Sequence, residues 1–138
     1  MNLLYAIYSV VLAGTIVGGT VPPTQLPTPV QEVRTLESEI NRLSLKYEIA
    51  SSTVYAIIKC ESQLYGEAVH QNLDKNGNVW STDIGYLQIN DYYHRDTMRE
   101  LGLDINNQWE ALEYGFLLMK SQGYSPWKAS EFCWRKEI

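Results

Sequence analysis

The first 31 residues contain no charged side chain, and this feature confines the folded part of the chain to the residues that follow. From Leu3 to Val21 the sequence is mostly Leu, Ile, Val, Ala and Gly. A stretch of about 19 residues at 1.5 Å per residue approaches the roughly 30 Å of a bilayer core. We therefore expect residues 1–21 to be a secretory signal peptide or, alternatively, an uncleaved N-terminal membrane anchor. Either segment makes the rest of the chain extracytoplasmic, secreted or anchored to the membrane by its N-terminus.

Residues 22–31 are typical of a linker. Four of the five prolines of the chain lie between Pro22 and Pro29. Proline fixes φ and has no backbone donor, so such a segment favours an extended spacer. The remaining residues, 32–138, have the size of one domain with a single core. We expect this domain to be a monomer.

The charge of the chain bears on its partners. Its net charge is −5, and no run of Lys or Arg offers a local basic face. Nucleic acid is therefore excluded as the main partner, because binding to phosphates needs such a face.

Apolar residues recur at intervals of three and four in several segments of this domain, which predicts a mainly helical fold. The expected helices span residues 33–47, 51–62, 91–102 and 107–123. Ser51 or Ser52 is the expected cap of the second helix and Asn107 of the fourth. The residues expected to face the core are Val33, Leu36, Ile40, Leu43, Val54, Ile57, Ile58, Met98, Leu101, Trp109, Leu112, Phe116 and Met119.

A small β-rich part is expected between the second and third helices. Asn76 and Gly77 form a strong signal for a tight turn, with Leu73 before it and Val79 and Trp80 after it. A short hairpin or irregular lobe fits this segment, which runs on to Asn90. The sequence therefore predicts an α+β domain that is mainly α.

Glu61 is the first candidate for chemistry. It lies near the end of the second expected helix, after the apolar residues Val54, Ile57 and Ile58. Apolar surroundings and the negative end of a helix dipole both disfavour a charged carboxylate, so they raise its pKa. A carboxyl group that keeps its proton near neutral pH is what a general acid for glycosidic cleavage requires. By position alone, an ordinary solvated Glu is the alternative interpretation.

Three short motifs add weight to Glu61. They are the run Ala56–Ser62 that ends in Glu61-Ser62, then Ala68-Val69-His70, then Asp83–Asn90 with Gly85-Tyr86-Leu87-Gln88 inside it. Together they resemble the lytic transglycosylase and lysozyme-like family. The resemblance covers about residues 36–134 and implies a small helical domain, a β-like lobe and a substrate groove between them. It implies that Glu61 is the catalytic acid and base and that the Gly85–Gln88 segment lines the groove, with Ser62 beside it.

The sequence departs from the family pattern at its third motif. The Ala-Tyr-Asn motif of many transglycosylases has no clear copy here, and residues 123–127 with Ala129 and Ser130 stand in its place. The residue that would orient Glu61 is therefore left unassigned.

The resemblance implies cleavage of the β-1,4 bond after N-acetylmuramic acid in peptidoglycan glycan strands. The expected activity is that of a lytic transglycosylase with a 1,6-anhydro product. A hydrolytic muramidase and a catalytically inactive glycan-binding envelope domain are the alternatives. A muramidase would need a second carboxylate within roughly 5–10 Å of the first. Asp83 is the best candidate, although it can instead hold its loop by accepting backbone hydrogen bonds.

Polar and aromatic residues supply the expected substrate contacts. Gln88 and Asn90 would face one side of an extended segment and suit the amides and hydroxyls of a sugar. Alternatively, one of them closes a loop or caps the next helix, as expected for Asn90. Ten Tyr and four Trp against two Phe suggest rings with polar edges in a wet cleft. The candidates for sugar stacking, of which at least half are expected to be core residues, are Tyr86, Tyr92, Tyr114, Tyr124 and Trp127.

The two cysteines, Cys60 and Cys133, are expected to form a disulfide that suits an oxidising compartment. By loop entropy such a bridge stabilises the fold by roughly 3–5 kcal/mol. Two buried free thiols are the alternative. No metal or cofactor is expected, since His70 and His94 lack neighbours at ligand spacing. The Asp74–Asn78 run has its glycine misplaced for a calcium loop.

Overall fold

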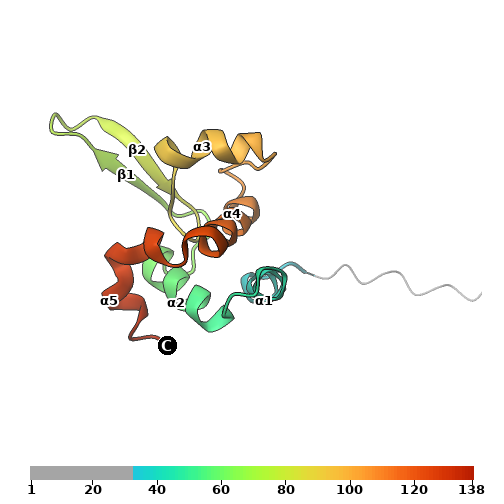
Figure 1. Ribbon diagram of the computed structural model, residues 1–138. Coiled ribbons are helices and arrows are strands. Elements are labelled where there is room, and N and C mark those ends of the chain that lie inside the picture. Colours follow the sequence, from blue (N-terminus) through green and yellow to red (C-terminus); the bar gives the residue numbers. More distant parts are fainter. Residues whose placement is uncertain (1–32) are drawn as a thin grey trace, which may run out of the picture. The chain divides into compact units, whose positions relative to one another are not determined.

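The computed structural model describes residues 33–138, so the expected signal or anchor segment (1–21) and the linker (22–31) lie outside the described residues. The domain is α+β, as predicted, with a small antiparallel sheet at one end of a larger helical part (Figure 1). In residues 33–138, none of the helices is long and apolar enough to cross a bilayer. The elements are α1 (Leu36–Tyr47), α2 (Ser51–Ser62), β1 (Val69–Leu73), β2 (Val79–Ile84), β3 (Ile89–Asn90), α3 (Asp91–Glu100), α4 (Gln108–Gln122), the 3-10 helix η1 (Ser125–Ser130) and α5 (Glu131–Trp134).

The four expected helices are all present, and their ends show which local signals were decisive. Asn107 caps α4 by accepting hydrogen bonds from the Trp109 and Glu110 amides, as predicted. The predicted cap of α2 is wrong, because Ala50 holds the cap position and makes no side-chain bond. The chain continues into η1 and α5, two short helices that the sequence patterns did not predict.

Two residues assigned to apolar helix faces are exposed. Thr35 and Ser38 form a reciprocal capping box, so α1 begins at Leu36 and leaves Val33 outside the helix and in solvent. Helix α3 ends at Glu100, one residue before Leu101, which is also exposed. Both predictions extended a helical period past the residue at which the helix begins or ends.

The sheet forms where the Asn76-Gly77 turn predicted a hairpin. The Asp74 carboxylate accepts hydrogen bonds from the Asn76 and Asn78 amides, and Gly77 takes a φ of 82°, which favours glycine. The hairpin of β1 and β2 projects from the helices with α3 beside it (Figure 1). Strand β2 pairs with β1 on one side and β3 on the other, so Asp83 lies between His70 and Asn90.

The hydrophobic core gathers around α4, where Leu112, Phe116 and Met119 are buried as predicted. Leu87, from the segment between β2 and β3, enters this core against Gly115. A Cβ on Gly115 would lie 2.2 Å from Leu87 Cδ1, so any larger residue there would force the Leu87 side chain to move. The contact fixes the segment that follows β2 against the helical part of the domain.

The C-terminal segment returns to α2 and is covalently fixed there. Cys60 and Cys133 form a disulfide across a sequence separation of 73 residues, which confirms the predicted pairing. Trp134 is buried, and its Nε1 donates to the carbonyl of Trp127 at 3.1 Å. These contacts bring η1 and α5 next to the end of α2 that carries Glu61.

Candidate functional site

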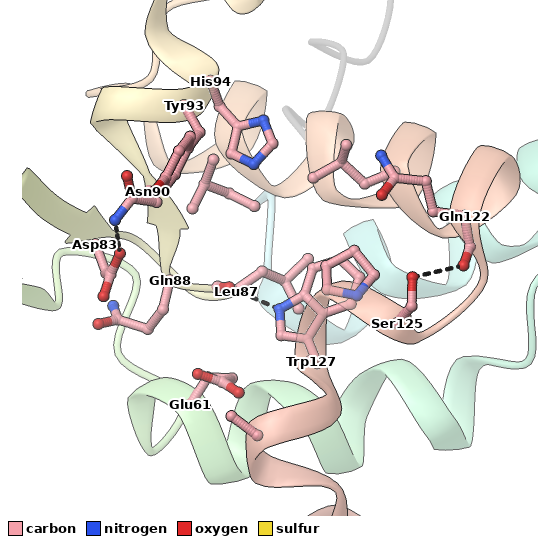
Figure 2. A pocket seen from close by; sticks show the side chains of 14 residues that line it. Glu61, Asp83, Leu87, Gln88, Asn90, Tyr93, His94, Gln122, Ser125 and Trp127 are labelled. Carbon is pink, nitrogen blue, oxygen red and sulfur yellow. Dashed lines mark hydrogen bonds between the residues drawn. The ribbon is translucent and has the colours of Figure 1, made fainter.

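A cavity of about 480 Å³ lies between the sheet and the C-terminal helices. Figure 2 shows Glu61 on α2, Asp83 and Asn90 on the sheet side, and His94 on α3 around it. Helix α4 and the segment 125–129 complete its wall. The lining mixes carboxylates, amides and an imidazole with apolar residues, which is the character of a site for a polar organic ligand.

Glu61 occupies a position that favours its protonated form. It is the penultimate residue of α2, which ends where Gln63 adopts a left-handed conformation with a φ of 54°. Burial raises the pKa of Glu61, and the nearby Asp83 charge raises it further. A hydrogen bond from Ser130 opposes these two effects. The direction agrees with the prediction from sequence, although Asp83 contributes in a way that the sequence did not indicate.

Ser130 is the residue that contacts the Glu61 carboxyl group. Its hydroxyl donates to Glu61 Oε1, and it also lies 3.2 Å from the carbonyl oxygen of Trp127. A serine hydroxyl has one proton to donate and lone pairs to accept with. It can therefore donate to Glu61 Oε1 both when Glu61 is ionised and when Glu61 carries its proton on Oε2. The bond occupies Oε1 and leaves Oε2, among the described residues, as the oxygen able to pass a proton to a ligand.

The Asp83 carboxylate is held by side-chain amides and not by the backbone bonds that were expected. Asn90 Nδ2 donates to Asp83 Oδ1 at 2.7 Å, and Asn72 Nδ2 donates to Asp83 Oδ2 at 3.0 Å. Both asparagines also donate to the Ser81 hydroxyl. The network fixes Asp83 on the sheet surface, where it faces the same cavity as Glu61.

A second cavity of about 370 Å³ meets the first one at Glu61. The two cavities share Glu61, Asp83 and Gln88, and the second one continues past Ser62 and His70. Glu61 therefore lies where the two spaces adjoin. An extended ligand placed through both would have its middle at Glu61.

The prediction that Gln88 and Asn90 face one side of an extended segment is wrong. Gln88 has a φ of 50°, so the segment is not extended there and the two amides do not alternate along a strand. Gln88 Nε2 donates to the carbonyls of Gly85 and Ala68, so this residue closes the loop. Asn90 precedes α3 but makes no capping bond with its side chain. Both nevertheless border the first cavity.

Gly85 and Ser62 contribute to the backbone geometry of the site. Gly85 has a φ of 80°, a conformation that favours glycine, and its amide donates to the Ala68 carbonyl at 2.8 Å. Ser62 is buried and donates to the Ile58 carbonyl at 3.1 Å, which commits its hydroxyl proton within α2. Both residues therefore position Glu61 and the loop opposite to it.

Three of the five aromatic candidates for sugar stacking are core residues, which confirms the expectation that at least half of them would be. Tyr86 and Tyr114 are buried, and neither borders the cavity. The Tyr114 hydroxyl lies 3.0 Å from His94 Nδ1, within hydrogen-bond distance. Tyr124 packs on Trp134. Trp127 does border the cavity, but it is buried and its Nε1 donates to the Leu87 carbonyl. Tyr93, which the sequence patterns did not single out, lines the cavity.

Metal binding finds no support in the described part of the chain. Residues 33–138 hold no group of three or more His, Cys, Asp or Glu side chains arranged to bind a metal ion. Burial lowers the pKa of His94, which favours the neutral imidazole.

Comparison with known proteins does not indicate a function for this chain. No protein-family model matches this chain, and no curated protein sequence is significantly similar to it.

Proposed function

We propose that this chain is an extracytoplasmic glycosidase of lysozyme-like fold that cleaves the β-1,4 bond after N-acetylmuramic acid in peptidoglycan. Glu61 is its general acid and base. One observation carries the proposal: a half-buried Glu61 with a raised pKa lies at the junction of two cavities, where the middle of a glycan strand would pass. The helical domain with its small β lobe agrees with this family.

The first step requires Glu61 to be protonated. Its Oε2 passes the proton to the glycosidic oxygen, and the bond between that oxygen and C1 of the muramic acid residue breaks. Positive charge develops on the sugar ring while negative charge develops on Glu61. The Ser130 hydroxyl donates to Oε1 throughout the step, and this hydrogen bond becomes stronger as the carboxylate forms.

The second step decides the product. In a transglycosylase the 6-hydroxyl of the same sugar attacks C1 and loses its proton to Glu61, which gives a 1,6-anhydro ring and restores the acid. We favour this course because each oxygen of Asp83 accepts a hydrogen bond from an asparagine amide, which weakens Asp83 as a nucleophile or base. Hydrolysis by a muramidase is the second candidate, since Asp83 borders the cavity that holds Glu61.

The proposal is tested by mass spectrometry of the muropeptides that the full-length chain releases from purified peptidoglycan. Anhydro-muropeptides are expected and would identify a transglycosylase. Products with reducing ends would instead identify a muramidase and give Asp83 a direct role. If a folded, disulfide-intact chain releases nothing, the glycosidase proposal is wrong and the glycan-binding module takes its place.

Replacing Ser130 with alanine is expected to move the pH profile of the reaction. The Ser130 bond lowers the pKa of Glu61 by stabilising the carboxylate, so its loss raises that pKa further. The alkaline limb of the pH–rate profile, on which Glu61 loses its proton, should therefore shift to higher pH. Loss of a hydrogen bond to a charged group should also reduce kcat by about tenfold.

Two further variants separate this positioning role from a general effect on folding. Ser130→Thr keeps the hydroxyl and should restore the wild-type pH profile. Ser121→Ala removes a hydroxyl whose partners, within residues 33–138, are carbonyls of its own helix, and it should leave both kcat and the profile unchanged. A Ser130→Ala profile that coincides with that of the wild type would remove Ser130 from the mechanism.

A further inference from the structure

Three aromatic side chains are exposed together beside the first cavity. Trp80 projects from β2, and Tyr92 and Tyr93 lie in the first turn of α3. Their exposed fractions are 45%, 68% and 64%, whereas five other large aromatic residues of the domain are buried: Tyr86, Tyr114, Phe116, Trp127 and Trp134. We call these three residues the aromatic platform.

The rings of the platform hold one another in place. The ring centroids of Tyr92 and Tyr93 lie 5.1 Å apart, and those of Trp80 and Tyr92 lie 5.6 Å apart. Trp80 and Tyr93 lie 6.3 Å apart, and all three pairs meet edge to face. Such pairs favour fixed ring orientations, so the platform keeps its shape in the absence of a ligand. A ligand that binds there loses little free energy to the ordering of these side chains.

The platform is continuous with the site that contains Glu61. Tyr93 lines the first cavity, and Figure 2 shows it on the side of Asn90 and His94, across from Glu61. The other two rings pack on Tyr93 and do not themselves line the cavity. A chain-like ligand that fills the cavity and leaves it past Tyr93 would meet Tyr92 and Trp80 next.

The chemistry of the cavity selects the ligand class. The lining of the first cavity includes three polar residues, Asp83, Gln88 and Asn90. Such a lining suits a hydroxylated ligand more than a lipid or an apolar peptide. A sugar ring has an apolar carbon–hydrogen face and a polar rim, and Trp and Tyr offer an apolar face with a polar edge. We propose that the aromatic platform binds the sugar rings of a glycan strand outside the cavity, so that long strands bind better than short ones.

This inference rests on the proposed function and is tested by binding, independently of catalysis. The full-length chain carrying Glu61→Gln is the parent, and the probes are β-1,4-linked N-acetylglucosamine oligomers of two and six residues. Adding Trp80→Ala should weaken the binding of the hexamer by about tenfold, since stacking on an aromatic ring is worth on the order of 1 kcal/mol. The affinity for the dimer should not change.

The matched control is Tyr55→Ala, which removes a ring of similar exposure, 43%, from α2, outside the cavity lining. It should leave both affinities unchanged. Two results would overturn the role of the platform in glycan binding and leave the proposed function in place. In the first, the parent and the Trp80→Ala variant bind the hexamer equally well. In the second, the variant loses the same affinity for the dimer as for the hexamer. A folded parent that binds neither the oligomers nor whole peptidoglycan would overturn the proposed function as well.

Discussion

Replacing Glu61 with glutamine is expected to reduce the release of muropeptides by at least about a thousandfold, the usual contribution of general acid and base catalysis. Glutamine has almost the size of glutamate but has no acidic proton for the leaving oxygen and cannot accept one from the 6-hydroxyl. In the proposed reaction Glu61 performs both transfers, so no second group would rescue the variant. The measurement is the initial rate of muropeptide release by the full-length chain at its optimal pH, with glycan binding measured in parallel.

The same variant should not lose stability, which separates a catalytic Glu61 from a structural one. The raised pKa means that the folded chain holds the Glu61 proton more tightly than the unfolded chain does. This preference stabilises the fold below the ordinary Glu pKa of about 4.3 and is lost as the pH rises through the raised pKa. Glutamine stays neutral throughout, so at pH 7 the Glu61→Gln variant should melt at or above the temperature of the wild type, and the difference should diminish in acid.

A glutamate on the surface provides the control. Glu37 is exposed on α1, and Glu37→Gln should change neither the rate nor the melting temperature. A Glu61→Gln variant that releases muropeptides at the wild-type rate would remove Glu61 from the chemistry. Release by neither the wild type nor the variant, with glycan binding retained in both, would instead favour the glycan-binding domain.

Features that depend on neighbouring residues were predictable from the sequence. The four long helices follow from apolar spacing, the hairpin from the Asn76-Gly77 turn, and the α4 cap from Asn107. The place of Glu61 at a helix end in apolar surroundings also follows from local sequence, and so does the direction in which its pKa is shifted. Each of these depends on interactions within a few turns or a few strand positions.

Apart from the Cys60–Cys133 pairing, features that depend on distant residues were missed. Ser130 meets Glu61 only because the chain folds back across 69 residues, and its short helix carries no periodic signal. Tyr86 and Tyr114 seemed suitable for a wet cleft, but a polar hydroxyl does not show whether a ring lies in the core or on the surface. The left-handed backbone of Gln88 redirects its amide to two carbonyls, which an alternating pattern cannot indicate.

The disulfide between Cys60 and Cys133 should have the largest effect on stability. Replacing both cysteines with alanine frees a loop defined by a separation of 73 residues, for which chain entropy predicts a loss of about 4 kcal/mol in the free energy of unfolding. For a domain of this size the melting temperature should fall on the order of 20 °C. The measurement is thermal unfolding followed by circular dichroism, for the double variant and for the wild type with and without reductant.

The effect on activity should be smaller than the effect on stability, because the C-terminal segment has other attachments. Trp134 stays buried, and Lys59 on α2 pairs with Glu137 at 2.5 Å. Well below its melting temperature, the double variant should therefore retain Ser130 beside Glu61 and keep the wild-type pH profile. A profile shifted as in Ser130→Ala would show instead that the disulfide itself holds Ser130 in place. An unchanged melting temperature on reduction of the wild type would contradict the stabilising role of the bond, since the reduced chain differs from the oxidised one in that bond alone.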